Sequence, residues 1–502
     1  MEANARVVQN VAERMAREVR ASPLPLGEGS GVRAAPPVSG WTRRVTSDEV
    51  ASEGPHGADR TLTPVPSPHG RGERQVSNSA NGASPPQVLR CACAALAVVV
   101  HASPALAGWD VGGEIAGELR VFPHDPAYPG QLEHWQPSIS VMPDIRWESD
   151  DKSHQFVFVP FARLDAQDDQ RTHYDLREAY YRYNAGTKWS LTLGAAKVFW
   201  GRAESRHLVD IVNQTDAVED IDEEDKLGQP MANLALYNDW GKVDLCVMSG
   251  FRDRTFAGRE GRPRFGLVVD TDRAIFEADA RRKAPDFAVR YSHYLGDFDF
   301  GVAAFHGTSR EPRLAVDASN ARLLPVYDRI FQASADLQYT AGAWLLKGEA
   351  IWRAGQGSDF FAAVVGFEYT LYQLFGSNAD LGLLAEYLHD GRDEGFVVAT
   401  FADAPDLGAL PVAAAPFTIF EDDVFAGARL ALNDPQDTAL LAGAIFDASD
   451  GTTAMSVEAS RRFGTSWTAD LEARFFVNVD AANIASAFRD DDFVTLRLTR
   501  HF

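Results

Sequence analysis

From Trp109 to the last residue, Phe502, the chain alternates apolar and polar side chains in segments of about ten residues, with almost no helical period. The clearest stretch is DFAVRYSHYLGDFDFGVAAFHG, where Phe287, Val289 and Tyr291 alternate with other residues before a tight LGD turn. A period of two predicts strands whose two faces differ, and two strands around a short turn predict a β-hairpin. An all-β fold is therefore expected.

The stretch GAWLLKGEAIWRAG indicates which surroundings the two faces meet. Trp344, Leu346 and Trp352 fall on one face, and Lys347 and Glu349 fall on the other. Aromatic residues at both ends of an apolar row are typical of a strand that faces lipid, because Trp and Tyr favour the membrane interfaces. The charged face then needs water or opposite charges, as inside a barrel.

The chain ends in the same pattern, DFVTLRLTRHF. Val494, Leu496, Leu498 and Phe502 share a face that is broken only by Arg500. A terminal aromatic residue after alternating apolar residues resembles the C-terminal signal by which bacterial outer-membrane barrels reach their assembly machinery. The third residue from the end is usually apolar or aromatic in that signal, so Arg500 is a departure from it.

Short and long connections alternate along the chain, as they do where short periplasmic turns and longer extracellular loops join the strands of an up-and-down barrel. We therefore predict a transmembrane up-and-down antiparallel β-barrel of roughly 18 strands, within a range of about 16–20. Twenty strands result if RFGLVVDTDRAIFEADAR forms a hairpin of its own. A soluble sandwich array or a propeller is the alternative, but no blade repeat is found.

Composition excludes several classes of protein. The formal net charge of −23 argues against a nucleic-acid partner, which needs clustered Lys and Arg. No run of 18 or more uncharged apolar residues occurs, so a helical membrane span in the mature protein is not expected.

The N-terminal part is expected to lie outside the folded protein. Residues 1–87 are rich in Pro, Gly, Ser and Arg and are predicted to be disordered, or a mis-assigned reading frame whose true start is near Val88 or Leu89. Residues 88–107 have the pattern of a secretory signal peptide, with cleavage between Ala107 and Gly108. Residues 108–502 are then the barrel, in which Cys246 is the one remaining cysteine.

A long connection at residues 200–230 is the main candidate for a functional site. It is strongly acidic, yet it also carries apolar residues such as Leu208, Ile211 and Val212, which a purely solvated loop would not need. We expect it to fold into or over the barrel mouth and to form a constriction that favours cations. The alternatives are a solvated surface loop or acids bridged by divalent ions between lipopolysaccharides; a calcium loop is disfavoured, because its Gly and terminal Glu are missing. The candidate pore residues are Arg177, Glu178, Lys197, Arg202, Asp210, Asp216, Glu219, Asp222, Glu223, Glu224 and Asp225.

The stretch LREAYYRY, followed by AKVFWG and DIVNQTD, resembles a group of proteobacterial porin-like outer-membrane proteins related to the alginate-export type barrels. The resemblance covers about 45 residues and is nearly silent on the substrate. The usual Asn-Pro-x-Asp motif appears here without its proline. The resemblance implies that the motif positions lie at the barrel wall and at the start of the inward loop; they are Arg177, Glu178, Lys197, Trp200, Asp210, Asn213 and Asp216.

Two further segments are notable. A basic cluster in FRDRTFAGREGRPRFG consists of Arg252, Arg254, Arg259, Arg262 and Arg264. It would produce a transverse field if it faced the acidic loop across a pore, and a solvated loop is the equal alternative. The apolar loop DAPDLGALPVAAAPFTIFEDD is either a surface contact or a plug of the lumen.

Catalytic signals are poor, since no nucleophile elbow, zinc signature or phosphate-binding glycine loop is present. We therefore expect no enzyme activity, no cofactor and no metal. The predicted function is an outer-membrane porin for passive or selective diffusion of small hydrophilic solutes. The alternative is a plugged barrel that acts as a receptor or adhesin through its loops. Expected partners are outer-membrane lipid, lipopolysaccharide and the barrel-assembly machinery; a monomer and a homotrimer both remain open.

Overall fold

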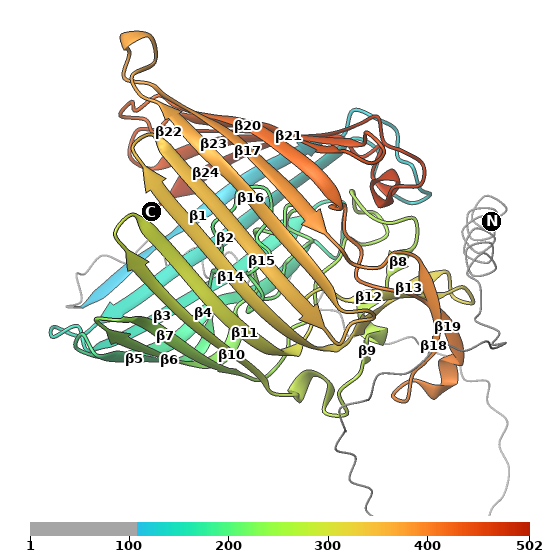
Figure 1. Cartoon of the computed structure of the whole chain (residues 1–502). Helices are drawn as coiled ribbons and strands as arrows, with labels where there is room; N and C mark the ends of the chain where they lie inside the picture. The colour runs from blue at the N-terminus through green and yellow to red at the C-terminus, as the bar shows by residue number, and fades with distance from the viewer. Residues whose placement is uncertain (1–107) are drawn as a thin grey trace, which may run out of the picture. The chain divides into compact units, whose positions relative to one another are not determined.

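The computed structural model describes residues 108–502, and the predicted disorder, reading frame and signal peptide of residues 1–107 lie outside that range. Eighteen strands form a closed antiparallel barrel in which each barrel strand pairs with the next one, and β24 returns to pair with β1 (Figure 1). The barrel strands are β1 (Trp109–Val121), β2 (Trp135–Glu148), β3 (His154–Asp165), β4 (His173–Ala185), β5 (Trp189–Ala196), β6 (Gln229–Asn238), β7 (Gly241–Met248), β10 (Asp286–Leu295), β11 (Phe298–Thr308), β14 (Arg329–Ala341), β15 (Trp344–Ala354), β16 (Phe360–Leu371), β17 (Asp380–Asp390), β20 (Asp422–Ala431), β21 (Ala439–Asp447), β22 (Thr453–Phe463), β23 (Trp467–Val477) and β24 (Phe493–His501). The all-β barrel prediction is confirmed.

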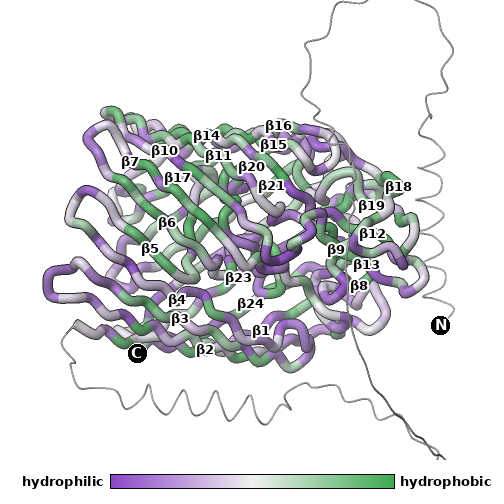
Figure 2. The backbone as a smooth tube through the Cα atoms, turned by 90° about the horizontal axis from the view of Figure 1, so that it is seen from below, coloured by the Kyte–Doolittle hydropathy of each residue, from purple (hydrophilic) through white to green (hydrophobic). Residues whose placement is uncertain are grey.

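The outer face of the wall is apolar, because every second residue of a strand points away from the lumen. On β15 the predicted row is observed: Trp344, Leu346 and Trp352 are exposed, whereas Glu349 and Arg353 point inward and are buried. In Figure 2 the hydrophobic colour follows the barrel strands and the connecting turns are mostly hydrophilic. The closed strand pairing leaves no unpaired edge in the wall.

The last strand closes the barrel. Leu496 and Leu498 lie opposite Leu119 and Gly117 of β1, and both leucines are about half exposed on the outer face. Phe502 follows the last strand residue, and its backbone exchanges two hydrogen bonds of 3.1 Å with Gly113. Val494 belongs to the same outward row, so the strand that the terminal pattern predicts is confirmed.

Connections alternate between the two ends of the barrel. Two-residue turns at 239–240, 296–297 and 342–343 lie at one end, and the longest connections, 197–228, 249–285 and 391–421, lie at the other. Within residues 108–502 the helices are single 3₁₀ turns: η1 (Thr271–Arg273), η2 (Arg281–Lys283), η3 (Leu374–Gly376), η4 (Pro405–Leu407) and η5 (Ile484–Ala487). No helix in this range is long and apolar enough to cross a membrane.

A second, small sheet gathers the strands of the long connections at one end of the barrel (Figure 1). It contains β8 (Val268–Val269), β9 (Ile275–Phe276), β12 (Arg313–Asp317), β13 (Arg322–Tyr327), β18 (Phe396–Thr400) and β19 (Ala409–Ala413). The optional hairpin at RFGLVVDTDRAIFEADAR is therefore wrong, because β8 and β9 each pair in parallel with β13. Ile275 is buried in the small sheet with Leu324 and Val412. This burial stabilises the segment in the small sheet and not as an extra hairpin of the barrel wall.

Candidate functional site

The β5–β6 connection, residues 197–228, is called the inward loop because it crosses the barrel to the strands opposite its origin. Two carboxylates of that wall accept hydrogen bonds from its backbone. Glu349 on β15 accepts from the N–H groups of Arg202, Ala203 and Val209. Glu386 on β17 accepts from the N–H groups of Glu204 and Ser205, both at 2.8 Å. A carboxyl group offers two oxygen acceptors, each with two lone pairs, so these two side chains can bind several N–H groups and fix the first half of the loop.

Apolar side chains hold the same half of the loop against the wall. Leu208, Val209, Ile211 and Val212 are all buried in one cluster. Their partners are inward-facing wall residues, among them Val157, Val159, Met231, Met248, Phe305, Ile330, Ile351 and Leu388. This hydrophobic core fills the part of the lumen beside β3–β17, and it explains why an acidic loop carries so many apolar residues.

Ion pairs anchor the second half of the loop to β1, β3 and β4, and on β1 the partner is Arg120, which binds Asp220 at 2.8 Å. Asp216 binds Arg177 at 2.6 Å, and Glu219 binds Arg163 at 2.6 Å. Burial opposes ionisation of Asp216, but the nearby His173 imidazole, 3.5 Å away, and the charge of Arg177 hold the pKa of Asp216 below its usual range. The loop thus presents fixed carboxylates to a row of wall arginines.

Glycine permits the return of the loop to the wall. A Cβ on Gly228 would lie 2.3 Å from the carbonyl oxygen of Arg177, closer than any side chain tolerates. The backbone of the loop therefore passes directly over β4, where Arg177 occupies a bulge in the pairing with β3.

One group of potential metal ligands occurs among residues 108–502, formed by His173, Asp216 and Glu219. His173 Nε2 lies 3.5 Å from both an Asp216 and a Glu219 carboxylate oxygen. Both carboxylates already bind arginines, and these positive charges would repel a divalent cation. The donor set suits a protonated imidazole in an ion-pair network better than a metal.

A cavity of about 950 Å³ lies on the other side of the inward loop, between the loop and the wall of β20–β24. Its lining runs from Ala439, the first residue of β21, to Ile445 near the end of that strand. On β23 it runs from Asp470 to Phe476, and on β22 from Ala454 to Ser460. The space therefore follows most of the length of three neighbouring strands.

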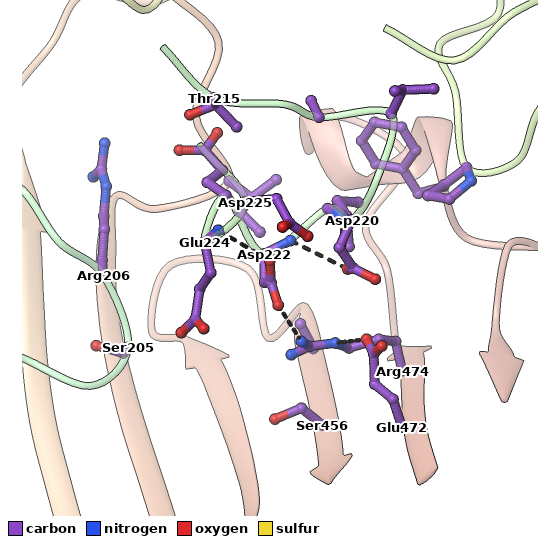
Figure 3. Close-up of a pocket in the computed structure, with 18 of the residues that line it drawn as sticks. Ser205, Arg206, Thr215, Asp220, Asp222, Glu224, Asp225, Ser456, Glu472 and Arg474 are labelled. Carbon is purple, nitrogen blue, oxygen red and sulfur yellow. Dashed lines mark hydrogen bonds and ion pairs between the residues drawn. The ribbon is translucent and has the colours of Figure 1, made fainter. Parts of the chain in front are cut away.

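The tip of the inward loop projects carboxylates into this cavity, as Figure 3 shows for Asp222, Glu224 and Asp225. Arg474 on β23 is shared by Asp222 at 3.0 Å, Glu458 at 3.1 Å and Glu472 at 2.8 Å. Within residues 108–502, neither Glu224 nor Asp225 has an ion-pair partner. Acidic and basic side chains are about equally frequent over the whole lining, so the negative surplus is local to the loop tip.

Crowding of carboxylates makes some of them harder to ionise. Burial inside the barrel and the Asp220 carboxylate raise the pKa of Asp222. Burial and the Glu219 carboxylate likewise raise the pKa of Asp225. The charge of the loop tip therefore grows with pH over a higher range than that of isolated aspartates.

The four remaining candidate pore residues lie in different surroundings. Glu178 is half-buried on β4 opposite Val159, and Asp210 is buried beside Lys226 at 3.5 Å. Arg202 pairs with Asp299 at 2.8 Å and with Asp336 at 3.3 Å on the far wall. Lys197 follows the end of β5 at Ala196 and is an exposed residue at the start of the inward loop.

The basic cluster does not face the acidic loop as a unit, so both expectations for it need correction. Arg254 binds Glu223 at 2.6 Å and Arg252 binds Asp175, which neutralises these charges locally. Arg262 is fully buried with Asp491 at 2.7 Å. Arg264 is buried and donates to backbone carbonyls, and Arg259 alone is exposed. The pairing of Arg262 with Asp491 was not predictable from the sequence, because the two residues are 229 positions apart.

The apolar loop DAPDLGALPVAAAPFTIFEDD takes neither predicted role, a surface contact or a plug of the lumen, as a whole. Its residues Ala409–Ala413 form β19 of the small sheet, whereas 416–420 border the cavity. Phe417 contacts Phe265 with ring centroids 5.8 Å apart. The segment lines the mouth of the cavity without filling it.

Several residues that organise the site were not among the predicted site residues. They are the loop acceptors Glu349 and Glu386, the wall cations Arg120, Arg163 and Arg474, and Glu118, which binds Arg171 and Arg497. All are charged residues at inward positions of strands whose sequences alternate between apolar and polar residues. That position is the signal by which a search of the sequence would find them.

Comparisons with known proteins add little to this geometry. No protein-family model and no curated protein matches the chain. Among solved structures it is similar to Wzi, an outer-membrane protein involved in group 1 capsule assembly in Escherichia coli, at 8% identity and a TM-score of 0.45, covering 82% of this chain and 87% of Wzi. A BenF-like porin from Pseudomonas fluorescens matches at 8% identity and 0.45, covering 80% and 99%. OmpT of Vibrio cholerae, in its trimer form, matches at 11% and 0.40, covering 78% and 99%. The fold assignment therefore rests on the strand pairing of this chain itself.

Proposed function

We propose that residues 108–502 form an outer-membrane channel that admits small hydrophilic solutes and favours cations at the tip of the inward loop. The observation that carries the proposal is the cavity that follows β21–β23 for most of their length beside the loop. The apolar outer wall supports a place in a membrane. Selectivity would come from electrostatic filtering at fixed carboxylates, with no covalent step.

The test is planar-bilayer recording with the refolded protein, read as single-channel steps and as the reversal potential in a KCl gradient. We expect steps with a cation-favouring reversal potential. The double change Glu224→Gln and Asp225→Asn should move that potential toward zero, because neither carboxylate is neutralised by an ion pair. Asp437→Asn, at an exposed position in a short turn, is the matched control.

The second candidate function is that of a plugged barrel acting through its surface loops. It is favoured by the hydrophobic core that fills part of the lumen and by the small sheet at the end with the long connections. Wzi, one of the similar structures, is described as a carbohydrate-binding β-barrel. An intact barrel without conductance would support this candidate over the channel.

The expected partners remain part of the proposal. The outward row of the last strand supports recognition by the barrel-assembly machinery, and the apolar wall supports contact with lipid and lipopolysaccharide. A homotrimer is tested by the molar mass of the detergent-solubilised protein. The relation to alginate-export type barrels stays a prediction from the short motif.

A further inference from the structure

Aromatic rings form a continuous row at the mouth of the cavity. Phe396 contacts Phe417, which contacts Phe265; Phe265 contacts Phe488 at 5.3 Å between centroids, and Phe488 contacts Phe476 at 6.3 Å. All except Phe396 border the cavity. The rings come from four separate segments, so the row exists only in the folded barrel.

The aromatic row leads to the acidic loop tip along one strand. The inward face of β23 presents Asp470, Glu472, Arg474 and Phe476 in succession, each about 7 Å from the next. Phe476 is the last ring of the row, and Arg474 is the residue shared by Asp222 and Glu472. The phenylalanine rings and the surplus carboxylates Glu224 and Asp225 therefore line the same cavity.

We propose that this cavity selects organic cations that carry a flat apolar group, such as an aromatic ring bearing an ammonium. This inference rests on the proposed channel function and specifies its substrate class. The apolar group packs on the phenylalanine rings, whose faces also attract cations. The ammonium is drawn to Glu224 and Asp225, which have no cationic partner in residues 108–502. The volume of about 950 Å³ accommodates such a solute.

The experiment compares three probes for current block in the channel recordings: benzyltrimethylammonium, tetramethylammonium and benzoate. The first carries both features, the second lacks the ring and the third carries the opposite charge. We expect benzyltrimethylammonium to block at a concentration at least tenfold lower than either of the others. Phe265→Ala should abolish this advantage, whereas Phe375→Ala, at a fully exposed turn, should leave the advantage and the potassium current unchanged.

Glu224→Gln separates the contribution of charge from that of the ring. It should weaken block by both ammonium compounds and spare the difference between them. Equal block by the three probes, or an undiminished advantage in Phe265→Ala, would overturn the inference while the channel function stands. If no potassium current is found, the proposed function fails; calorimetric titration of the detergent-solubilised protein with the same probes then decides whether the site binds them.

Discussion

Removing the Glu349 carboxylate should release the first half of the inward loop. In the folded protein this side chain accepts three backbone hydrogen bonds, from Arg202, from Ala203 at 2.9 Å and from Val209 at 3.2 Å. Ala203 and Val209 are buried, so in Glu349→Ala their N–H groups lose their acceptor without gaining water. Each buried unsatisfied donor costs about 1–3 kcal/mol, which gives about 2–6 kcal/mol for the two.

Hydrogen exchange read by mass spectrometry on the peptide covering 200–212 measures this cost directly. Because each 1.4 kcal/mol is a factor of about ten, exchange should accelerate at least about 30-fold in Glu349→Ala. Glu349→Gln retains one carbonyl oxygen as an acceptor in a side chain of the same shape. Its exchange rate should therefore lie between those of the unmodified protein and Glu349→Ala. Glu349→Ala should also make the single-channel current flicker. Exchange within about threefold of the unmodified protein would refute the assignment of Glu349 as an anchor.

Three further predictions follow from individual contacts. Cation preference should increase as pH rises through a range above the ordinary aspartate pKa of about 3.9. The reason is that a carboxyl with a raised pKa, such as Asp222, is neutral below that pKa and charged above it. Reversal potentials between pH 4 and 9 measure this preference, and a profile already flat above pH 5 would contradict the prediction. Arg262→Met should cost about 3–5 kcal/mol by stranding the buried Asp491 carboxylate, as measured by denaturant unfolding in lipid vesicles; Arg259→Met is the exposed control, and equal stability of the two variants would be inconsistent with the pairing. Gly228→Val should prevent the inward loop from seating over the Arg177 carbonyl, raising the proteolysis of the loop while the barrel stays folded; unchanged proteolysis would argue against that close approach.

The strands of this fold are predictable from sequence because the alternation of residues within each strand indicates the surroundings of its two faces. Trp344, Leu346 and Trp352 alternate with charged residues regardless of what the neighbouring strands are. The fold of the inward loop is also signalled, since Leu208 and Val212 would otherwise be exposed. These inferences need only the period of the strand and the cost of exposing apolar surface.

The partners of the charged residues were not predictable in the same way. Arg474 and Asp222 are 252 positions apart, and Arg262 and Asp491 are 229 apart. Such pairs depend on barrel closure and on the path of long loops, which a single sequence does not specify. The basic cluster was therefore interpreted from its composition, whereas in the structure most of its members are individually neutralised or buried.

We infer that solutes pass between the inward loop and the wall of β20–β24, while the other part of the lumen is closed. The chain from Gly108 onward contains one cysteine, Cys246, which is buried in the hydrophobic core of the closed part. Ser456 borders the open cavity (Figure 3), so Ser456→Cys places a thiol in the proposed path. The decisive measurement is single-channel current during addition of a water-soluble cationic thiol reagent. We expect a lasting stepwise fall in Ser456→Cys and none in the unmodified protein. An unaffected Ser456→Cys channel would show that solutes do not take this path.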